Sequence, residues 1–262
     1  MRFAPLCCVF LCACGRCNTS APTLEASVKV DHPAKAPSQG CGKSASPAER
    51  IGDRSYVLGM PAPYDANEPY PLIFVFHGSF SDGSKIRALL DLERSGTRAV
   101  FVYPDGIGEG WTLTRDGRDV AFVDELVRNV EGDLCIDQHA IFAVGFSYGG
   151  WMACALACAR PTLLRGIVSI AGGGPNVPCD ASVAAMIVHG SNDFNEPFPS
   201  GEASRDHWLV ANACSNKTHA VGSCVAYEGC AAPVLFCRHE GAHVVPDFAA
   251  REAWTFVENA RR

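Results

Sequence analysis

The sequence has little charge, no long basic run and no long hydrophobic run. Only 19% of its 262 residues are charged, and its 22 Lys and Arg residues, outnumbered by 28 Asp and Glu, never form a run of five or more. Such a chain offers no basic face for the counterion release that drives nucleic-acid binding, so DNA and RNA are not expected as partners. No apolar stretch reaches 18 residues, so no membrane-spanning helix is predicted.

Hydrophobic residues are nevertheless plentiful. They make up 48% of the chain and occur as short runs along most of its length. This amount supports one sizeable core, and the chain length fits a single domain of ordinary size, which we expect to be a monomer. The same composition excludes disordered, coiled-coil and collagen-like chains.

The first residues have the pattern of an export signal. Met1-Arg2 is followed by an apolar run over residues 3–13, after which polarity rises. Leu11-Cys12-Ala13-Cys14 is similar to a bacterial lipoprotein cleavage box, so a lipid anchor at Cys14 is a second expectation. We predict a leader over residues 1–20 and a protein that is secreted, periplasmic or anchored at the cell surface. The alternative is a first strand or helix of a cytosolic domain.

The segment after the leader differs from the rest of the chain. Residues 21–47 are rich in Ala, Pro, Ser and Lys, a composition typical of a tether. The sequence therefore predicts a linker over residues 21–47 and a folded domain over residues 48–262.

Cysteine is unusually frequent, with 14 residues in the chain. Nine of them follow the leader: Cys41, Cys135, Cys154, Cys158, Cys179, Cys214, Cys224, Cys230 and Cys237. In an oxidising compartment this number predicts up to four disulfides and one remaining thiol. Cys224 and Cys230 flank a short Tyr-Glu-Gly turn and are expected to pair, with Cys214 and Cys237 as a candidate second pair, although spacing alone leaves the connectivity open.

Metal binding is the alternative use of these cysteines. The C-x-x-C pair Cys14 and Cys17 lies inside the leader, and Cys154 and Cys158 have the i,i+4 spacing of a helix rather than that of a zinc knuckle. We therefore expect no metal and no other cofactor.

Short apolar runs alternate with longer amphipathic stretches from residue 54 onward. This alternation is typical of βαβ units and predicts an α/β fold with a mostly parallel central sheet flanked by helices. The expected strands are residues 72–76, 99–103, 141–144, 166–171, 185–188 and 234–237, and the expected helices are residues 85–95, 119–134, 149–160 and 247–260.

One pentapeptide has the pattern of a catalytic motif. Gly145-Phe146-Ser147-Tyr148-Gly149 is a G-x-S-x-G sequence that lies between the expected strand 141–144 and the small-residue helix 149–160. A nucleophile elbow requires this context, because small neighbours allow the strand and helix to approach around a strained serine. The alternative is a glycine-rich turn with a helix-capping serine.

A serine nucleophile also needs a base and an orienting carboxylate. Asp193 directly follows the strand 185–188, and His243 follows the strand 234–237, which gives the order Ser, Asp, His at successive strand ends. The competing candidates are Asp180, Glu196 and Asp206 for the acid and His189 and His239 for the base.

Acyl transfer further requires hydrogen-bond donors for the developing oxyanion. The backbone N–H of Tyr148, at the helix start, and that of Ser79, in the loop after the first long strand, are the candidates. Trp111 lies in a glycine-rich loop and is a candidate substrate contact, because its ring could stack on a phenolic acyl group or a sugar. The alternative is an ordinary, partly buried tryptophan. Phe146 and Met152 are predicted to belong to the core.

Taken together, these stretches resemble a known enzyme family. Pro71 to Gly78, Ala143 to Gly150, His189 to Asp193 and Cys224 to His243 are similar to the secreted esterases that group feruloyl esterases with polyhydroxybutyrate depolymerases. Gly40-Cys41-Gly42-Lys43 favours the feruloyl-esterase branch.

The resemblance implies an α/β-hydrolase fold without a cofactor, and Ser147, Asp193 and His243 as nucleophile, orienting acid and base. Two positions depart from the family pattern, because Tyr148 replaces an Asn and Val244-Val245-Pro246 lacks the usual aromatic residue.

The expected activity is hydrolysis of a small-molecule or oligomeric ester, including polysaccharide-linked esters of plant cell walls. Depolymerisation of short-chain hydroxyalkanoates and removal of acetyl groups from xylan are alternatives within the same chemistry. A non-catalytic binding protein on the same fold is the alternative from a different class.

Overall fold

Residues 34–48 and 50–261 are described by a computed structural model. The predicted leader over residues 1–20 and the lipid anchor at Cys14 lie outside this part. A ten-stranded sheet forms its centre, with the strand order β1-β2-β4-β3-β5-β6-β7-β10-β9-β8. The strands are β1 (Arg50–Ile51), β2 (Arg54–Gly59), β3 (Tyr70–Phe76), β4 (Val100–Pro104), β5 (Ile136–Phe146), β6 (Gly166–Ile170), β7 (Ala184–Gly190), β8 (Thr218–Val221), β9 (Cys224–Tyr227) and β10 (Val234–His239).

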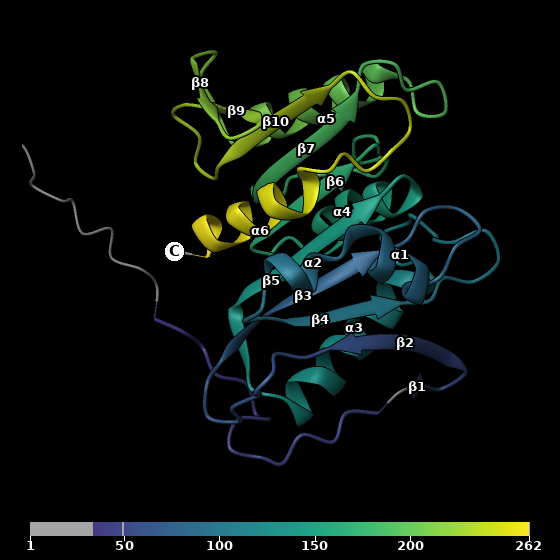
Figure 1. The fold of residues 1–262 in the computed structure, drawn as a ribbon, viewed down its shortest axis with the longest axis vertical. Coiled ribbons are helices and arrows are strands. Elements are labelled where there is room, and N and C mark those ends of the chain that lie inside the picture. Colours follow the sequence, from purple (N-terminus) through teal and green to yellow (C-terminus); the bar gives the residue numbers. More distant parts are fainter. Residues whose placement is uncertain (1–33, 49, 262) are drawn as a thin grey trace, which may run out of the picture. The chain divides into compact units, whose positions relative to one another are not determined.

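Six neighbouring strands, β4, β3, β5, β6, β7 and β10, run parallel, and antiparallel strands are added at both edges. The arrowheads of these six strands point to the same end of the sheet (Figure 1). In a parallel sheet the loops at this end gather the functional side chains. The expected mostly parallel sheet is confirmed.

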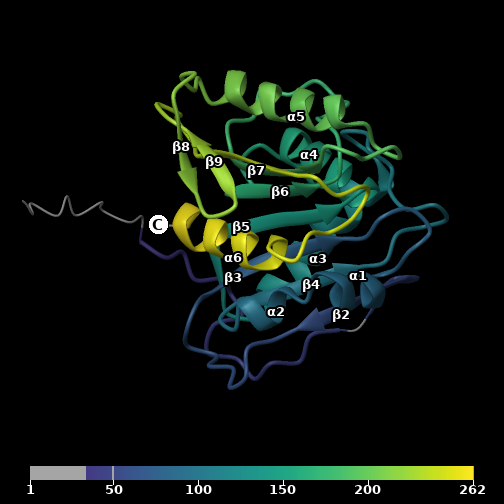
Figure 2. The same cartoon turned by 45° about the horizontal axis from the view of Figure 1, so that its top comes forward.

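Helices cover both faces of the sheet (Figure 2). They are α1 (Gly83–Leu90), α2 (Leu92–Ser95), α3 (Arg118–Asp133), α4 (Tyr148–Ala159), α5 (Phe198–Ala211) and α6 (Ala249–Ala260). One core cluster includes apolar residues of α3, α4 and α5, and the other includes those of α1, α2 and α6. Burial on both faces explains why β3 and β4 consist almost entirely of apolar residues.

The expected helix over residues 85–95 is two helices in the structure. α1 ends at Leu90, and Asp91 adopts left-handed backbone angles (φ 44°, ψ 40°) before α2 begins at Leu92. The backbone N–H of Asp91 donates to the carbonyl of Arg87, which closes the first helix. Aspartate is one of the residues that tolerate this conformation. The apolar pattern of the sequence continues across the break between the two helices and therefore does not reveal it.

The described part of the expected linker packs on the domain. The Ser38 N–H donates to the carbonyl of Ile136 at 2.9 Å, and the Ser38 hydroxyl donates to that of Leu134 at 2.7 Å. A disulfide joins Cys41 to Cys135. Backbone hydrogen bonds and a covalent link thus hold this segment, which lacks an apolar pattern, against the domain.

Four disulfides form in the described residues, and Cys154 is a buried free thiol. The pairs are Cys41–Cys135, Cys158–Cys179, Cys214–Cys230 and Cys224–Cys237. The number agrees with the expectation, but the expected pairing of Cys224 with Cys230 is wrong. Cys224 begins β9 and lies buried against β10, where Cys237 is within reach across the sheet, whereas Cys230 meets Cys214 beyond the end of α5.

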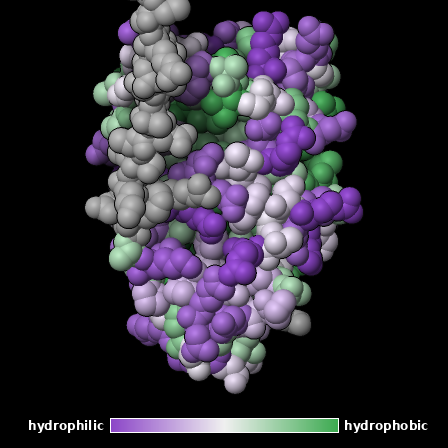
Figure 3. Space-filling model, turned by 60° about the vertical axis from the view of Figure 1, so that its left-hand side comes forward, coloured by the Kyte–Doolittle hydropathy of each residue, from purple (hydrophilic) through white to green (hydrophobic). Residues whose placement is uncertain are grey.

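Figure 3 shows the side of the molecule at which the parallel strands begin. Figure 3 shows hydrophilic residues over most of the visible surface there, with hydrophobic residues in small patches. Within the described residues, no helix combines the length and apolarity needed to cross a bilayer.

Candidate active site

Ser147 lies at a sharp turn between β5 and α4. Its backbone angles are φ 55° and ψ −120°, a conformation that a non-glycine residue rarely adopts. A Cβ on Gly149 would collide with the carbonyl oxygen of Phe76, and one on Gly145 would collide with the carbonyl of Gly149. Glycine at both positions therefore lets the strand and helix approach closely and leaves the serine side chain at the carboxyl end of the sheet.

His243 connects Ser147 to Asp193. Its Nε2 lies 2.8 Å from the Ser147 hydroxyl oxygen, and its Nδ1 lies 2.8 Å from Asp193 Oδ2. Because a carboxylate only accepts hydrogen bonds, Nδ1 carries the proton, and Nε2 is free to accept one from the hydroxyl. The structure thus brings together the three residues that the sequence selected for nucleophile, acid and base, from the ends of β5, β7 and β10.

The Asp193 carboxylate is buried but well solvated by protein groups. Its side chain is inaccessible to solvent, and Oδ1 accepts hydrogen bonds from the N–H groups of Asn195 and Glu196, each at 2.9 Å. Burial raises the pKa of Asp193. The hydrogen bonds from Glu196, His243 and Asn195 lower this pKa by more than burial raises it, so the net pKa lies below its ordinary value. The group is therefore a stable anion facing the imidazole.

Four of the five competing acids and bases lie outside the cleft wall, and Glu196 is the one that belongs to it. His189 is fully buried and its Nε2 lies 2.8 Å from the Glu196 carbonyl oxygen, while His239 Nδ1 accepts a hydrogen bond from the Gly241 N–H. Asp206 forms an ion pair with Arg205, and Asp180 is exposed. None of the four is hydrogen-bonded to Ser147 or His243 in the described chain.

The two candidate oxyanion donors flank the nucleophile. Ser79 lies on the wall of the cleft with Ser147, and Tyr148 is the first residue of α4. In the described part of the chain, neither of their backbone N–H groups donates to another protein group, so both are available to a ligand.

The loop that carries Ser79 is fixed to the loop after β4. His77 Nε2 accepts a hydrogen bond from the Gly106 N–H at 2.9 Å, and the Phe80 N–H donates to the Glu109 carbonyl at 3.0 Å. Burial lowers the pKa of His77, which keeps the ring neutral and able to accept. The Ser79 N–H is thereby held in a preorganised position.

The structure corrects the expectation for Trp111. This side chain is only 3% exposed, packs edge-on against Phe76, and is not part of the cleft wall. Its glycine-rich loop folds inward because the indole N–H finds a buried partner in the His77 carbonyl at 2.8 Å. Trp111 therefore supports the loop behind the active site rather than a substrate.

A cleft of about 700 Å³ opens above Ser147. Its wall includes Ile86 and Leu89 of α1, together with Phe146, whose ring packs 5.1 Å from that of His243. Phe146 was expected in the core, as was Met152, which is fully buried. Phe146 is the last residue of β5, so its side chain lies where the sheet ends and the cleft begins.

Sequence reasoning did not identify two polar cleft residues. Trp151, in the first turn of α4, donates its indole N–H to Glu196 Oε2 at 3.0 Å, and both side chains line the cleft. The sequence indicates Glu196 only as a competitor of Asp193 for the orienting acid. Its position three residues after Asp193, in the same loop, was the available signal.

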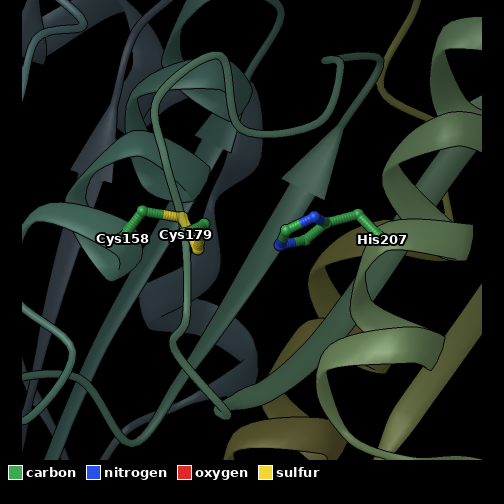
Figure 4. Close-up of side chains that lie close together, drawn as sticks. All are labelled: Cys158, Cys179 and His207. Carbon is green, nitrogen blue, oxygen red and sulfur yellow. A yellow bond between two sulfur atoms is a disulfide. The ribbon is translucent and has the colours of Figure 1, made fainter.

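One group of side chains has the spacing of metal ligands. The possible ligand atoms of Cys158, Cys179 and His207 all lie within 4.8 Å of one another. No other three His, Cys, Asp or Glu side chains in the described residues come together in this way. Figure 4 shows that the two sulfur atoms are bonded to each other and that the imidazole lies beside them. A disulfide has no thiolate to offer, so this cluster does not form a zinc site in the oxidised protein.

Comparison with known proteins agrees with this geometry. Residues 72–259 match the alpha/beta hydrolase family. The chain is 38% identical over 226 residues to the probable feruloyl esterase C of Aspergillus niger. This alignment covers 79% of this chain and 83% of that protein. It is 32% identical over 269 residues to feruloyl esterase D of Neurospora crassa, covering 85% and 90%.

Solved structures share the fold. The acetyl xylan esterase from Aspergillus awamori superposes with a TM-score of 0.66 at 14% identity, covering 81% of this chain and 99% of that one. The chain belongs to the alpha/beta hydrolase family, in its feruloyl-esterase branch, and is a carboxylic ester hydrolase.

Proposed function

We propose that this protein hydrolyses esters of hydroxycinnamic acids through an acyl-enzyme on Ser147. The observation that carries the proposal is the continuous hydrogen-bonded path from Ser147 through His243 to Asp193, at 2.8 Å for each step, at the base of an open cleft. The names of the relatives, feruloyl esterases C and D, support the acyl group.

The first half of the reaction forms the acyl-enzyme. The Ser147 oxygen attacks the ester carbonyl carbon while His243 Nε2 takes the hydroxyl proton. The carbonyl oxygen becomes negatively charged and accepts hydrogen bonds from the N–H groups of Tyr148 and Ser79. The imidazolium, stabilised by Asp193, then protonates the alcohol oxygen as the carbon–oxygen bond breaks.

The second half releases the acid. A water molecule gives a proton to His243 Nε2 and attacks the acyl carbon, and the same two N–H groups stabilise the second tetrahedral intermediate. The proton then returns to the Ser147 oxygen as the acid departs. No further group is required for this cycle.

The lining of the cleft supports an apolar acyl group. Ile86, Leu89 and Phe146 supply apolar wall. Phe80 is 75% exposed and directly follows Ser79 of the wall, and Phe194 is 89% exposed and directly precedes Asn195 of the wall. Apolar side chains therefore extend to the rim of the cleft. Exposed aromatic residues around a cleft favour apolar partners.

We also propose that the protein is exported, as the N-terminal pattern and the disulfides suggest. Disulfides persist in oxidising compartments and are rare in the cytosol. N-terminal sequencing of the protein recovered from the medium or the membrane fraction would test this. Recovery of the intact chain from the cytosol would contradict it.

The test of the activity is a panel of three esters: methyl ferulate, p-nitrophenyl acetate and a hydroxybutyrate oligomer, each with the purified protein and with Ser147→Ala. We expect turnover of methyl ferulate that is lost in the variant. Turnover of acetate alone would contradict the proposed acyl group but retain the mechanism. Inactivity on all three would favour the binding-protein alternative, and undiminished activity of Ser147→Ala would contradict the mechanism.

A further inference from the structure

Two carboxylates are the charged side chains of the cleft wall. Glu109 and Glu196 both line it, and no Lys or Arg does so in the described chain. A wall of this kind attracts hydrogen-bond donors and disfavours anions. Glu109 is exposed at the rim, whereas Glu196 is half-buried and fixed in place.

Three hydrogen bonds fix Glu196. Its N–H donates to Asp193 Oδ1 at 2.9 Å, and its carbonyl oxygen accepts from His189 Nε2 at 2.8 Å. The side chain is held separately, because Oε2 accepts from the indole N–H of Trp151 at 3.0 Å. Both ends of this residue are therefore anchored, one to the acid of the triad and the other to the first turn of α4.

The second carboxylate oxygen has no partner. Oε1 of Glu196 receives no hydrogen bond from any described residue and is not among the buried unpaired atoms, so it is accessible to solvent in a residue that lines the cleft. A fixed and ionised oxygen of this kind makes strong, charge-assisted hydrogen bonds with hydroxyl donors. Its preorganisation reduces the entropy lost when a ligand binds.

We propose that Glu196 determines specificity by accepting, through Oε1, a hydrogen bond from a hydroxyl group of the bound ester. This inference rests on the proposed function and extends it to the class of substrate, which is a neutral ester bearing a free hydroxyl. That hydroxyl has two sources, the phenol of the acyl group and a sugar hydroxyl of the alcohol. Trp151 acts as a positioning residue that holds Glu196.

The substitution Glu196→Gln is the sharpest probe of this contact. With the indole N–H of Trp151 directed at the amide oxygen, the remaining amide atom facing the cleft is –NH₂, a donor in place of an acceptor. The variant keeps the size of the side chain and its bond to Trp151, but it removes the acceptor from the substrate.

Two ratios of kcat/KM distinguish the two sources. The first compares methyl ferulate with methyl 3,4-dimethoxycinnamate, which lacks the phenolic hydroxyl. The second compares a feruloyl arabinose ester with methyl ferulate, which lacks the sugar. Because each ratio is measured within one variant, a general loss of folding or of catalytic competence cancels.

We expect the wild-type protein to favour the hydroxyl-bearing partner by about tenfold or more in at least one ratio, as a charge-assisted hydrogen bond implies. Glu196→Gln should lower that ratio to about threefold or less. Trp151→Phe should lower it in the same direction but by a smaller factor. Glu125→Gln, a charge removed from an exposed position of α3, is the matched control and should leave both ratios unchanged.

The outcomes separate as follows. A fall in the first ratio assigns the phenol, and a fall in the second assigns the sugar. If methyl ferulate is hydrolysed but Glu196→Gln changes neither ratio, the inference is overturned while the proposed function stands. If the protein hydrolyses no feruloyl ester, the proposed acyl group fails, and the inference fails with it.

Discussion

The indole N–H of Trp111 donates a hydrogen bond of 2.8 Å to the carbonyl oxygen of His77. Two residues after His77 lies Ser79, a residue of the cleft wall whose N–H is a candidate oxyanion donor. The bond therefore connects the glycine-rich loop around Trp111 to the geometry of the active site. It explains why a tryptophan that resembles a substrate contact in the sequence is buried in the structure.

Trp111→Phe should impair catalysis without weakening substrate binding. The variant leaves the buried His77 carbonyl without its partner, which costs about 1–3 kcal/mol of stability. We expect kcat for methyl ferulate to fall while KM changes little, and urea unfolding to show the loss of stability. A raised KM with unchanged kcat would contradict this and restore Trp111 as a substrate contact.

Asp193→Asn should nearly abolish turnover. An amide would offer its N–H to His243 or hold the imidazole in the wrong tautomer, and the same change in serine proteases lowers kcat by about 10⁴-fold. Steady-state kinetics on p-nitrophenyl acetate would measure the loss. A decrease of less than about tenfold would place the orienting acid elsewhere.

The same variant should alter how stability depends on pH. The pKa of Asp193 is lower in the folded protein than its ordinary value of 3.8, so the ionised carboxylate stabilises the fold. This contribution is fully present above the ordinary pKa and is lost as the pH falls through the lower, folded-state pKa. Urea unfolding at acidic pH should show a steeper loss for the wild type than for Asp193→Asn, and parallel curves would contradict the shift.

Gly149→Ala should disrupt the nucleophile elbow. The added Cβ would meet the carbonyl oxygen of Phe76, a backbone atom that cannot move aside. We expect a loss of at least about 1–3 kcal/mol of stability together with activity. Gly132→Ala is the control, because nothing lies within 4 Å of a Cβ at this position of α3. It should stabilise the protein by up to about 1 kcal/mol, and equal effects of the two variants on unfolding would refute the steric argument.

The disulfides should contribute unequally to stability. Cys41–Cys135 spans 94 residues and Cys158–Cys179 spans 21. Chain entropy predicts losses of about 5 and about 3 kcal/mol when each pair is replaced by serine. Denaturant unfolding of the two double variants would measure this. A larger loss for the shorter loop would show that local packing outweighs the constraint on the unfolded chain.

Much of the fold was predictable because the parallel strands are buried on both faces. Their continuous apolar runs mark β3 and β4 directly in the sequence. The helix α5 escaped prediction, since its buried face includes Gly201 and Ser204, which carry no apolar signal. The hairpin of β8 and β9 is mostly exposed and lies at the sheet edge, where few side chains need to be apolar.

The site was predictable to the extent that it depends on strand ends. Ser147, Asp193 and His243 each follow a recognisable strand, and the order of these strands in the sheet places their loops together. Glu196 and Trp151 carry no such mark. Their contact joins the loop after β7 to the first turn of α4, and a pairing between loop and helix is set by tertiary packing rather than by local pattern.

The most direct test of the account is covalent labelling of the nucleophile. An organophosphate such as diethyl p-nitrophenyl phosphate mimics the tetrahedral intermediate and reacts with an activated serine. We predict that one equivalent inactivates the protein, that peptide mass spectrometry places the adduct on Ser147, and that His243→Ala prevents the reaction. An adduct on another residue, or full ester hydrolysis after Ser147 has been labelled, would contradict the proposed mechanism.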